Sequence, residues 1–291
     1  MQLDLFGKQR FKVNLHAHTT LSDGKLSPAR VMQRYQSQGY DAIALTDHWF
    51  FGEGEESNDF TLLSGAEFNI GGHDCRNGVY HILSIGAKRT PAVEKAMPAQ
   101  KIIDAIHACG GLVILAHPAW SLNDPQEVAK LKRIDATEIY NTVSGVHMSR
   151  RPDSSLFVDM LAMRKCYLPL VADDDAHYYD NDDCRSWIMV EAADHSRDFL
   201  LPAIRKGSFY ATQGPEIHLL REGDEITVRT SPVSEIILYS NISWCPRVFE
   251  GNGITEAHYK IQENESFIRA EAVDKNGKRA WTNIIPLNSK T

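Results

Sequence analysis

Residues 11–24 read Phe-Lys-Val-Asn-Leu-His-Ala-His-Thr-Thr-Leu-Ser-Asp-Gly, an apolar strand pattern that runs directly into two histidines and an aspartate. The same ending, an apolar run followed by imidazole or carboxylate, recurs along the first two-thirds of the chain. The further instances are Asp47-His48, Glu67, His117 and Asp175-Ala176-His177. Divalent metals prefer these ligand types. Because the ligands are scattered along the chain, they predict a multi-metal catalytic site assembled by a fold, rather than a local structural zinc.

Helical patterns alternate with the predicted strands, which indicates parallel βαβ units with their chemistry at the carboxyl ends of the strands. Ser27 and Pro28 predict the start of a helix that runs to about Gln38, and residues 99–109 predict a second helix. The predicted strands are residues 11–16, 41–46, 61–67, 80–86, 112–116, 136–140 and 168–172.

His81 is an exception, because it lies at the start of its strand and not at the end. A Gly-rich turn at Gly71-Gly72 precedes it and suggests that strand 80–86 runs antiparallel to strand 61–67. In that case His81 reaches the same rim as the other ligands.

The pattern changes after about residue 213. Short strands with period-two alternation are predicted at 225–230, 235–239, 267–273 and 279–285, and Asp274 to Gly277 forms a hairpin turn. We therefore expect two domains, residues 1–213 and residues 214–291, the second a small antiparallel β domain. It could bind a partner or sugar, cover the first domain or form a dimer interface.

Composition narrows the possible partners of this 291-residue chain. Its formal net charge of −7 argues against a nucleic acid polymer as partner. The longest apolar run, residues 111–116, is too short to span a membrane, so no membrane partner is expected.

The start carries no signal-peptide pattern, and five scattered cysteines suggest free thiols. We expect a cytoplasmic protein, although a chain whose leader had been removed would look the same. The sequence leaves the oligomeric state open.

The ordered motifs closely resemble those of the PHP (polymerase and histidinol phosphatase) superfamily of metal-dependent phosphoesterases over roughly residues 11–213. The matching residues are His16-Ala17-His18, Ser22-Asp23-Gly24, Thr46-Asp47-His48, Gly65-Ala66-Glu67, His81, His117-Pro118, Asn141 and Asp175-Ala176-His177. The C-terminal segment resembles the β domain of a stand-alone subgroup that includes carbamate and amide hydrolases. The resemblance implies a distorted (β/α)7 barrel, followed by that small antiparallel β domain.

The resemblance also implies a trinuclear centre of zinc, manganese or iron, of which two or three sites would be filled. One metal would be held by His16, His18, Glu67 and Asp175. A second would be held by Glu67, His81 and His117, with Glu67 bridging, and a third by Asp23, His48 and His177. Three divalent ions would outweigh the three metal-binding carboxylates, so we expect a cationic pocket that favours a small anionic substrate.

These inferences predict a hydrolase, most simply a phosphoesterase in which metal-activated hydroxide attacks a phosphomonoester or nucleotide. The predicted catalytic residues are Glu67, His117, Asp175 and His177. One alternative keeps the trinuclear site but cleaves a carbamate, amide or other ester. Another is a non-catalytic metal-binding module. Arginines in the pocket would favour a dianionic substrate. An aromatic wall, for which residues 49–51 are candidates, would favour a neutral substrate.

Several other residues are weaker candidates for the site. Asp47 either orients a metal ligand from behind or caps the loop after its strand. Asn141 either contacts substrate or ties down a loop. Arg150 and Arg185 follow strand ends and are the best candidates for binding phosphate, ahead of Arg76. His73 could contact substrate or protonate the leaving group.

Overall fold

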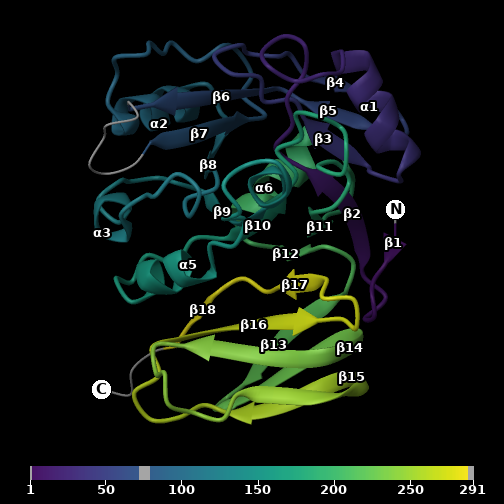
Figure 1. Cartoon of the computed structure of the whole chain (residues 1–291), viewed down its shortest axis with the longest axis vertical. Coiled ribbons are helices and arrows are strands. Elements are labelled where there is room, and N and C mark those ends of the chain that lie inside the picture. The colour runs from purple at the N-terminus through teal and green to yellow at the C-terminus, as the bar shows by residue number, and fades with distance from the viewer. Residues whose placement is uncertain (1, 72–78, 288–291) are drawn as a thin grey trace.

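The computed structural model describes residues 2–71 and 79–287, which form a mixed α/β fold with many short strands and few helices (Figure 1). The helices are α1 (Pro28–Ser37), α2 (Ala99–Ala108), α3 (Pro125–Val128), α4 (Thr142–Val146), α5 (Ser155–Ala162) and α6 (Arg197–Arg205). The first strands are β1 (Gln2–Leu3), β2 (Gln9–Asn14), β3 (Ala42–Ala44), β4 (Glu55–Glu56), β5 (Thr61–Leu63), β6 (Gly65–Ile70) and β7 (Tyr80–Ile85). Next come β8 (Leu112–Leu115), β9 (Ala136–Asn141), β10 (Leu170–Asp173), β11 (Trp187–Glu191) and β12 (Phe209–Thr212). The last are β13 (Ile217–Glu222), β14 (Glu225–Ser240), β15 (Val248–Lys260), β16 (Phe267–Val273), β17 (Arg279–Trp281) and β18 (Ile285–Pro286). Within the described residues, no helix has the length and apolar character needed to cross a membrane.

Two sheets carry the predicted ligands. One sheet contains β2, β3 and β5 as parallel neighbours. The other has the order β10-β9-β8-β7-β6, in which β8, β9 and β10 are parallel and β7 is antiparallel to both of its neighbours. Single bridges join the sheets where their strands end, between Ala17 and Ala176 and between His48 and Glu67. These bridges bring the ligand-bearing ends of both sheets together.

The mixed α/β class is confirmed, whereas a (β/α)7 barrel stays a prediction. The expected single strand over residues 61–67 is wrong, because the chain passes at Ser64 from β5 in one sheet to β6 in the other. Gly65 lies so close to the end of β3 that a Cβ atom there would stand 2.3 Å from the Leu45 carbonyl oxygen. Glycine therefore permits the close approach that joins the two sheets.

Several element boundaries agree with those predicted from local signals. Helix α1 begins at Pro28 and ends one residue before Gln38, and Gly39 follows with a positive φ of 75°. Ser27 takes the N-cap position, but its side chain accepts no capping hydrogen bond. The antiparallel pairing of β6 with β7 is also as expected, and it places His81 opposite Asn69.

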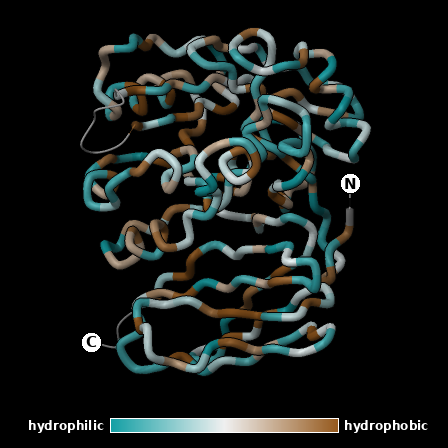
Figure 2. Tube along the Cα trace, viewed as in Figure 1, coloured by the Kyte–Doolittle hydropathy of each residue, from teal (hydrophilic) through white to brown (hydrophobic). Residues whose placement is uncertain are grey.

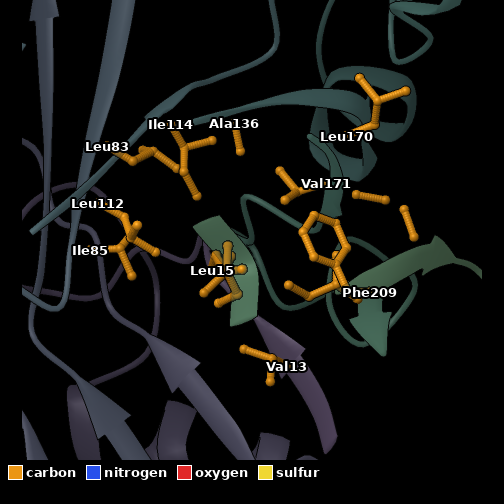
Figure 3. Close-up of a cluster of buried hydrophobic side chains, with 14 of the residues drawn as sticks. Val13, Leu15, Leu83, Ile85, Leu112, Ile114, Ala136, Leu170, Val171 and Phe209 are labelled. Carbon is orange, nitrogen blue, oxygen red and sulfur yellow. The ribbon is translucent and has the colours of Figure 1, made fainter. Parts of the chain in front are cut away.

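The main hydrophobic core lies between the two sheets. Val13 and Leu15 of the first sheet, and Leu83 and Ile114 of the second, are at most 1% exposed and point toward one another (Figure 3). Along the trace, hydrophobic segments follow these strands and also the strands of the C-terminal part, which has a core of its own (Figure 2). This hydrophobic core holds in place the strands that carry the polar site.

The C-terminal strands β13 to β18 form an antiparallel layer (Figure 1). The layer joins the first part of the chain through the pairing of β17 with β12, so one sheet runs through both parts. Arg269 of β16 also donates two hydrogen bonds to Asp159 of α5, and Trp281 stacks on Tyr140 of β9. A domain boundary between residues 213 and 214 stays a prediction.

Candidate metal centre

The predicted metal ligands meet in one cluster. Most of them lie just after strands, whereas Glu67 lies inside β6 and His81 at the start of β7. Each of three groups of side chains has ligand atoms within 4.8 Å of one another. The groups are His16, His18, Glu67 and Asp175; His18, Asp23, His48 and His177; and His48, Glu67 and His81.

The first of these groups has the same members as the first predicted ligand set. The third predicted set also comes together, with His18 added to it. The second set differs, because His48 takes the place of His117 beside Glu67 and His81. His117 stays close, with its Nε2 3.5 Å from Glu67 Oε1 and 3.8 Å from Asp175 Oδ2. The predicted ligands are thus brought together, while their assignment to individual metals stays a prediction.

Hydrogen bonds outside the cluster decide which histidine nitrogen faces it. His16 Nδ1 lies 2.7 Å from Glu138 Oε1, and His177 Nδ1 lies 2.7 Å from the carbonyl oxygen of Asp175. A carbonyl oxygen and an ionised carboxylate can only accept hydrogen bonds. Nδ1 therefore carries the proton in both rings. In their neutral forms, the two rings present the Nε2 lone pair to the cluster, as metal ligation requires.

The donor set fits a divalent metal. Asp175 Oδ1 is buried and lies 3.0 Å from His16 Nε2 and 3.1 Å from His18 Nε2, yet it makes no hydrogen bond. The two Nε2 atoms are themselves 3.2 Å apart. Lone pairs that crowd together in this way at fully buried residues need a cation between them.

The electrostatics of the cluster show the same need for positive charge. Burial opposes the charged form of His18, but the Asp175 and Glu67 carboxylates outweigh it and raise the pKa of His18 to about 9. The same balance raises the pKa values of His16 and His117. Burial likewise opposes ionisation of Glu67 and Asp175, but the surrounding histidines hold both carboxyl pKa values well below the usual range.

The cluster opens into a cavity of about 150 Å³. Beyond the predicted ligands, its wall consists of Trp120, Val143, Ser144 and Met148. The Trp120 ring meets the His117 ring edge-on at 4.9 Å between centroids and the His81 ring at 5.7 Å. Among residues 2–71 and 79–287, no lysine or arginine lines this cavity. Beyond the predicted ligands, the described part of the cavity wall is therefore apolar apart from Ser144.

The other candidate residues have different surroundings. Arg150 donates to the Gly145 carbonyl oxygen, and Arg185 donates to Asn181 and lines a separate cavity. Trp49 packs against Phe68 away from the metal cavity. Neither arginine lines the metal cavity, so phosphate binding by them stays a prediction. His73 and Arg76 lie outside the described residues.

Asp47 and Asn141 are both buried and engaged with protein partners. Asp47 accepts hydrogen bonds from the Thr19 backbone and from Ser22, whose hydroxyl lies 3.3 Å from His18 Nδ1. It thus holds the loop that leads to Asp23. The Asn141 amide donates to Glu138 at 2.8 Å and to Asp175 Oδ2 at 3.2 Å, and it is absent from the cavity wall. A substrate contact of Asn141 stays a prediction.

Two residues in this region were missed by the sequence reasoning. Glu138 is fully buried in β9 and contacts His16 and Asn141. A charged residue inside an apolar strand is rarely buried without a partner, and that signal could have identified it. Trp120 lies three residues after His117, in a segment where its direction could not be predicted.

Fold and site together define a mixed α/β protein with a buried cluster of histidines and carboxylates able to hold divalent metal. No protein-family model matches the chain, and no curated protein matches it. A two-domain protein from Bacteroides vulgatus ATCC 8482, which contains a predicted PHP-like metal-dependent phosphoesterase, matches over 98% of both chains with a TM-score of 0.54 and 15% identity. The PHP resemblance is therefore confirmed at the level of the fold.

Two further solved structures are similar over part of the chain. An amidohydrolase from Chromobacterium violaceum, with bound sulfate and no metal, is 14% identical and covers 58% of this chain and 89% of its own, with a TM-score of 0.43. A candidate metal-dependent phosphoesterase from Bifidobacterium adolescentis ATCC 15703 is 14% identical and covers 57% and 87%, with a TM-score of 0.39.

Proposed function

We propose that this protein is a metal-dependent phosphoesterase that hydrolyses a small phosphomonoester or nucleotide. The observation that carries the proposal is the convergence of His16, His18, Glu67 and Asp175, with Asp175 Oδ1 buried and lacking a hydrogen bond. Glu67 and Asp175 of this group also line a small cavity. When bound, divalent zinc, manganese or iron would supply hydroxide at neutral pH and neutralise charge on the ester.

The side chains have distinct roles in this proposal. Glu67 is 1% exposed, and its two carboxylate oxygens face different partners, so it can bridge two metal positions. Oε1 lies 2.5 Å from His81 Nδ1, and Oε2 lies 2.9 Å from His18 Nε2. His117 completes the position next to His81. Asp23, His48 and His177 hold the third position, nearer to solvent, because the Asp23 side chain is 54% exposed.

The cavity limits the substrate. Its volume of about 150 Å³ is small, so the proposed substrate would place its phosphoryl group in the cavity. The remainder of the substrate would extend out of the cavity, past the Trp120 and Met148 side chains of its wall. The positive charge that binds phosphate would come from the metals, since none of the described cationic side chains lines the cavity.

A second candidate function, hydrolysis of a carbamate, amide or other ester, is favoured by this same wall. A dianion gains from a guanidinium fork, which the described residues of the cavity do not provide. An uncharged aryl or alkyl ester would gain instead from contact with Trp120 and Met148. The two functions share the metal site and differ in the bond that is cleaved.

The test is hydrolysis by protein stripped of metal and reloaded separately with Mn²⁺, Zn²⁺ or Fe²⁺. The substrates are phosphomonoesters, nucleotides, phosphodiesters, an aryl carbamate and an aryl amide. Glu67→Ala should abolish turnover, whereas Glu94→Ala, at an exposed carboxylate, should leave it unchanged. Phosphate ester turnover that is lost in Glu67→Ala supports the phosphoesterase. Turnover of the carbamate or amide alone supports the second candidate, and metal binding without any turnover supports a non-catalytic module.

A further inference from the structure

Glu138 connects several parts of the cluster without belonging to any predicted ligand set. It lies in β9 with no exposed surface. Its Oε1 is 2.7 Å from His16 Nδ1, and its Oε2 accepts a hydrogen bond from the backbone N–H of His117 at 2.7 Å. Oε2 also accepts from Asn141 Nδ2, which in turn donates to Asp175. One buried carboxylate thus contacts two predicted ligands directly and a third through Asn141.

The bond to His16 has a chemical consequence. The Glu138 carboxylate accepts from Nδ1–H, so Nε2 of the neutral ring is left as the only lone pair available for a metal. That Nε2 lies 3.1 Å from Glu67 Oε2 and 3.0 Å from Asp175 Oδ1, where the first metal is proposed to bind.

We propose that Glu138 is a positioning residue that sets the tautomer and orientation of His16 and thereby the metal affinity of the site formed by His16, His18, Glu67 and Asp175. The proposal rests on the metal centre of the proposed function, but it does not depend on which bond is cleaved. The bonds of Oε2 to His117 and Asn141 hold Glu138 itself in place, which keeps Oε1 directed at His16.

The variant Glu138→Gln tests this role, because an amide cannot replace a carboxylate at this position. If the amide oxygen faces His16, the NH₂ group meets the His117 backbone N–H, and two donors oppose each other. If the amide is flipped, its NH₂ group donates to His16 Nδ1, and the proton moves to Nε2. The first arrangement loosens the support of His117, and the second blocks the metal-binding nitrogen of His16.

The first measurement is zinc binding, by calorimetric titration and by bound zinc per chain. We expect Glu138→Gln to lose roughly 10- to 100-fold in affinity at one metal position. The matched control is Glu265→Gln, which neutralises another buried carboxylate, one bonded to Arg247 and Tyr259 and not to the cluster. This control should bind zinc like the wild type. Equal affinity in Glu138→Gln and the wild type, or an equal loss in both variants, would overturn the proposal.

A second measurement does not require any variant to fold. Nitrogen-15 NMR of the zinc-loaded wild-type protein reports which imidazole nitrogen carries the proton. We expect His16 to be protonated at Nδ1 and zinc-bound at Nε2, and the reverse would overturn the proposal.

These readouts separate the inference from the proposed function. A wild-type protein that shows this His16 tautomer and hydrolyses nothing supports the role of Glu138 and contradicts the enzyme. A wild-type protein that binds none of zinc, manganese and iron contradicts both.

Discussion

The ion pair between Asp159 and Arg269 should be among the most sensitive links between the two parts of the chain. Arg269 of β16 donates from Nε and Nη2 to the Asp159 carboxylate of α5 at 2.7 and 2.8 Å. The Arg269 side chain has no exposed surface, and its guanidinium lies 4.0 Å from the centre of the Tyr239 ring. Removing Asp159 would leave a fully buried cation without its main partner.

The cost of Asp159→Ala follows from this burial. Removing one partner of a buried pair costs about 3–5 kcal/mol, because the remaining charge is left without compensation. Glu271 lies 3.7 Å from Arg269 Nη1 and keeps part of that compensation. We therefore expect a loss of about 3 kcal/mol, at the low end of this range. The double variant Asp159→Leu with Arg269→Met removes both charges and should lie close to the wild type in stability.

Urea unfolding, followed by circular dichroism, measures these differences. The control is Glu127→Ala, which breaks an exposed pair with Lys130, where a loss of about 0–1 kcal/mol is expected. A loss in Asp159→Ala no larger than in this control would refute the reasoning, as would a double variant less stable than Asp159→Ala. A single transition that shifts as a whole would show that β16 and α5 unfold together.

Two further predictions concern the metal cluster, and a third concerns His218 in β13. Chelation of the metals should lower the thermal midpoint, because free metal at a hundred times its Kd stabilises by about 2.7 kcal/mol, and reloading should restore it; an unchanged midpoint would contradict metal binding to the folded state. Gly24→Ala should weaken metal binding at Asp23, His48 and His177, because the added Cβ would lie 2.4 Å from the His18 carbonyl oxygen. The control Gly52→Ala should be tolerated, because the nearest atom to its Cβ would be 3.8 Å away. Equal zinc affinities of the two variants would refute this prediction. Burial, aided by Arg10, lowers the pKa of His218 from its ordinary 6.5 to about 4, so the stability that comes from keeping this ring neutral is present above pH 6.5 and is lost as the pH falls toward 4. Acid unfolding curves of the wild type and His218→Phe should therefore converge at neutral pH and separate below it, with the variant less sensitive to acid.

The parts of the fold that could be predicted were those with strong local signals. Pro28 and Gly39 mark the limits of α1, and the apolar run before His117 gives β8. Strand β15 had no such signal, because most of its residues are exposed and two of its central positions, Gly251 and Gly253, are glycine. Its pairing with β14 makes it a strand, and that pairing depends on residues far away in the sequence.

The site likewise contains residues that could be predicted from the sequence and residues that could not. The residues predicted as metal ligands are brought together by the fold. Their chemistry and, for most of them, a position just after a strand pointed to them in the sequence. Arg150 and Arg185 were poor candidates for the cavity, because nearness to a strand end does not fix where a loop directs its side chains. Arg150 has a positive φ of 60° and bonds to the Gly145 carbonyl oxygen within its own loop. Glu138 was not predicted, because an acidic residue in the middle of a strand normally faces solvent, and only the structure shows that this one is buried.

The balance of charge explains why this cluster needs cations in any state of the protein. Glu67, Glu138 and Asp175 are at most 5% exposed and lie around His16. Protons on His16 and His18 provide compensation when no metal is bound, which is why the pKa values of both are raised. A metal must displace these protons to reach the Nε2 lone pairs, so metal affinity should rise as the pH approaches the His18 pKa of about 9. The groups that make the metal-free protein hold protons are therefore the same groups that are proposed to bind metal.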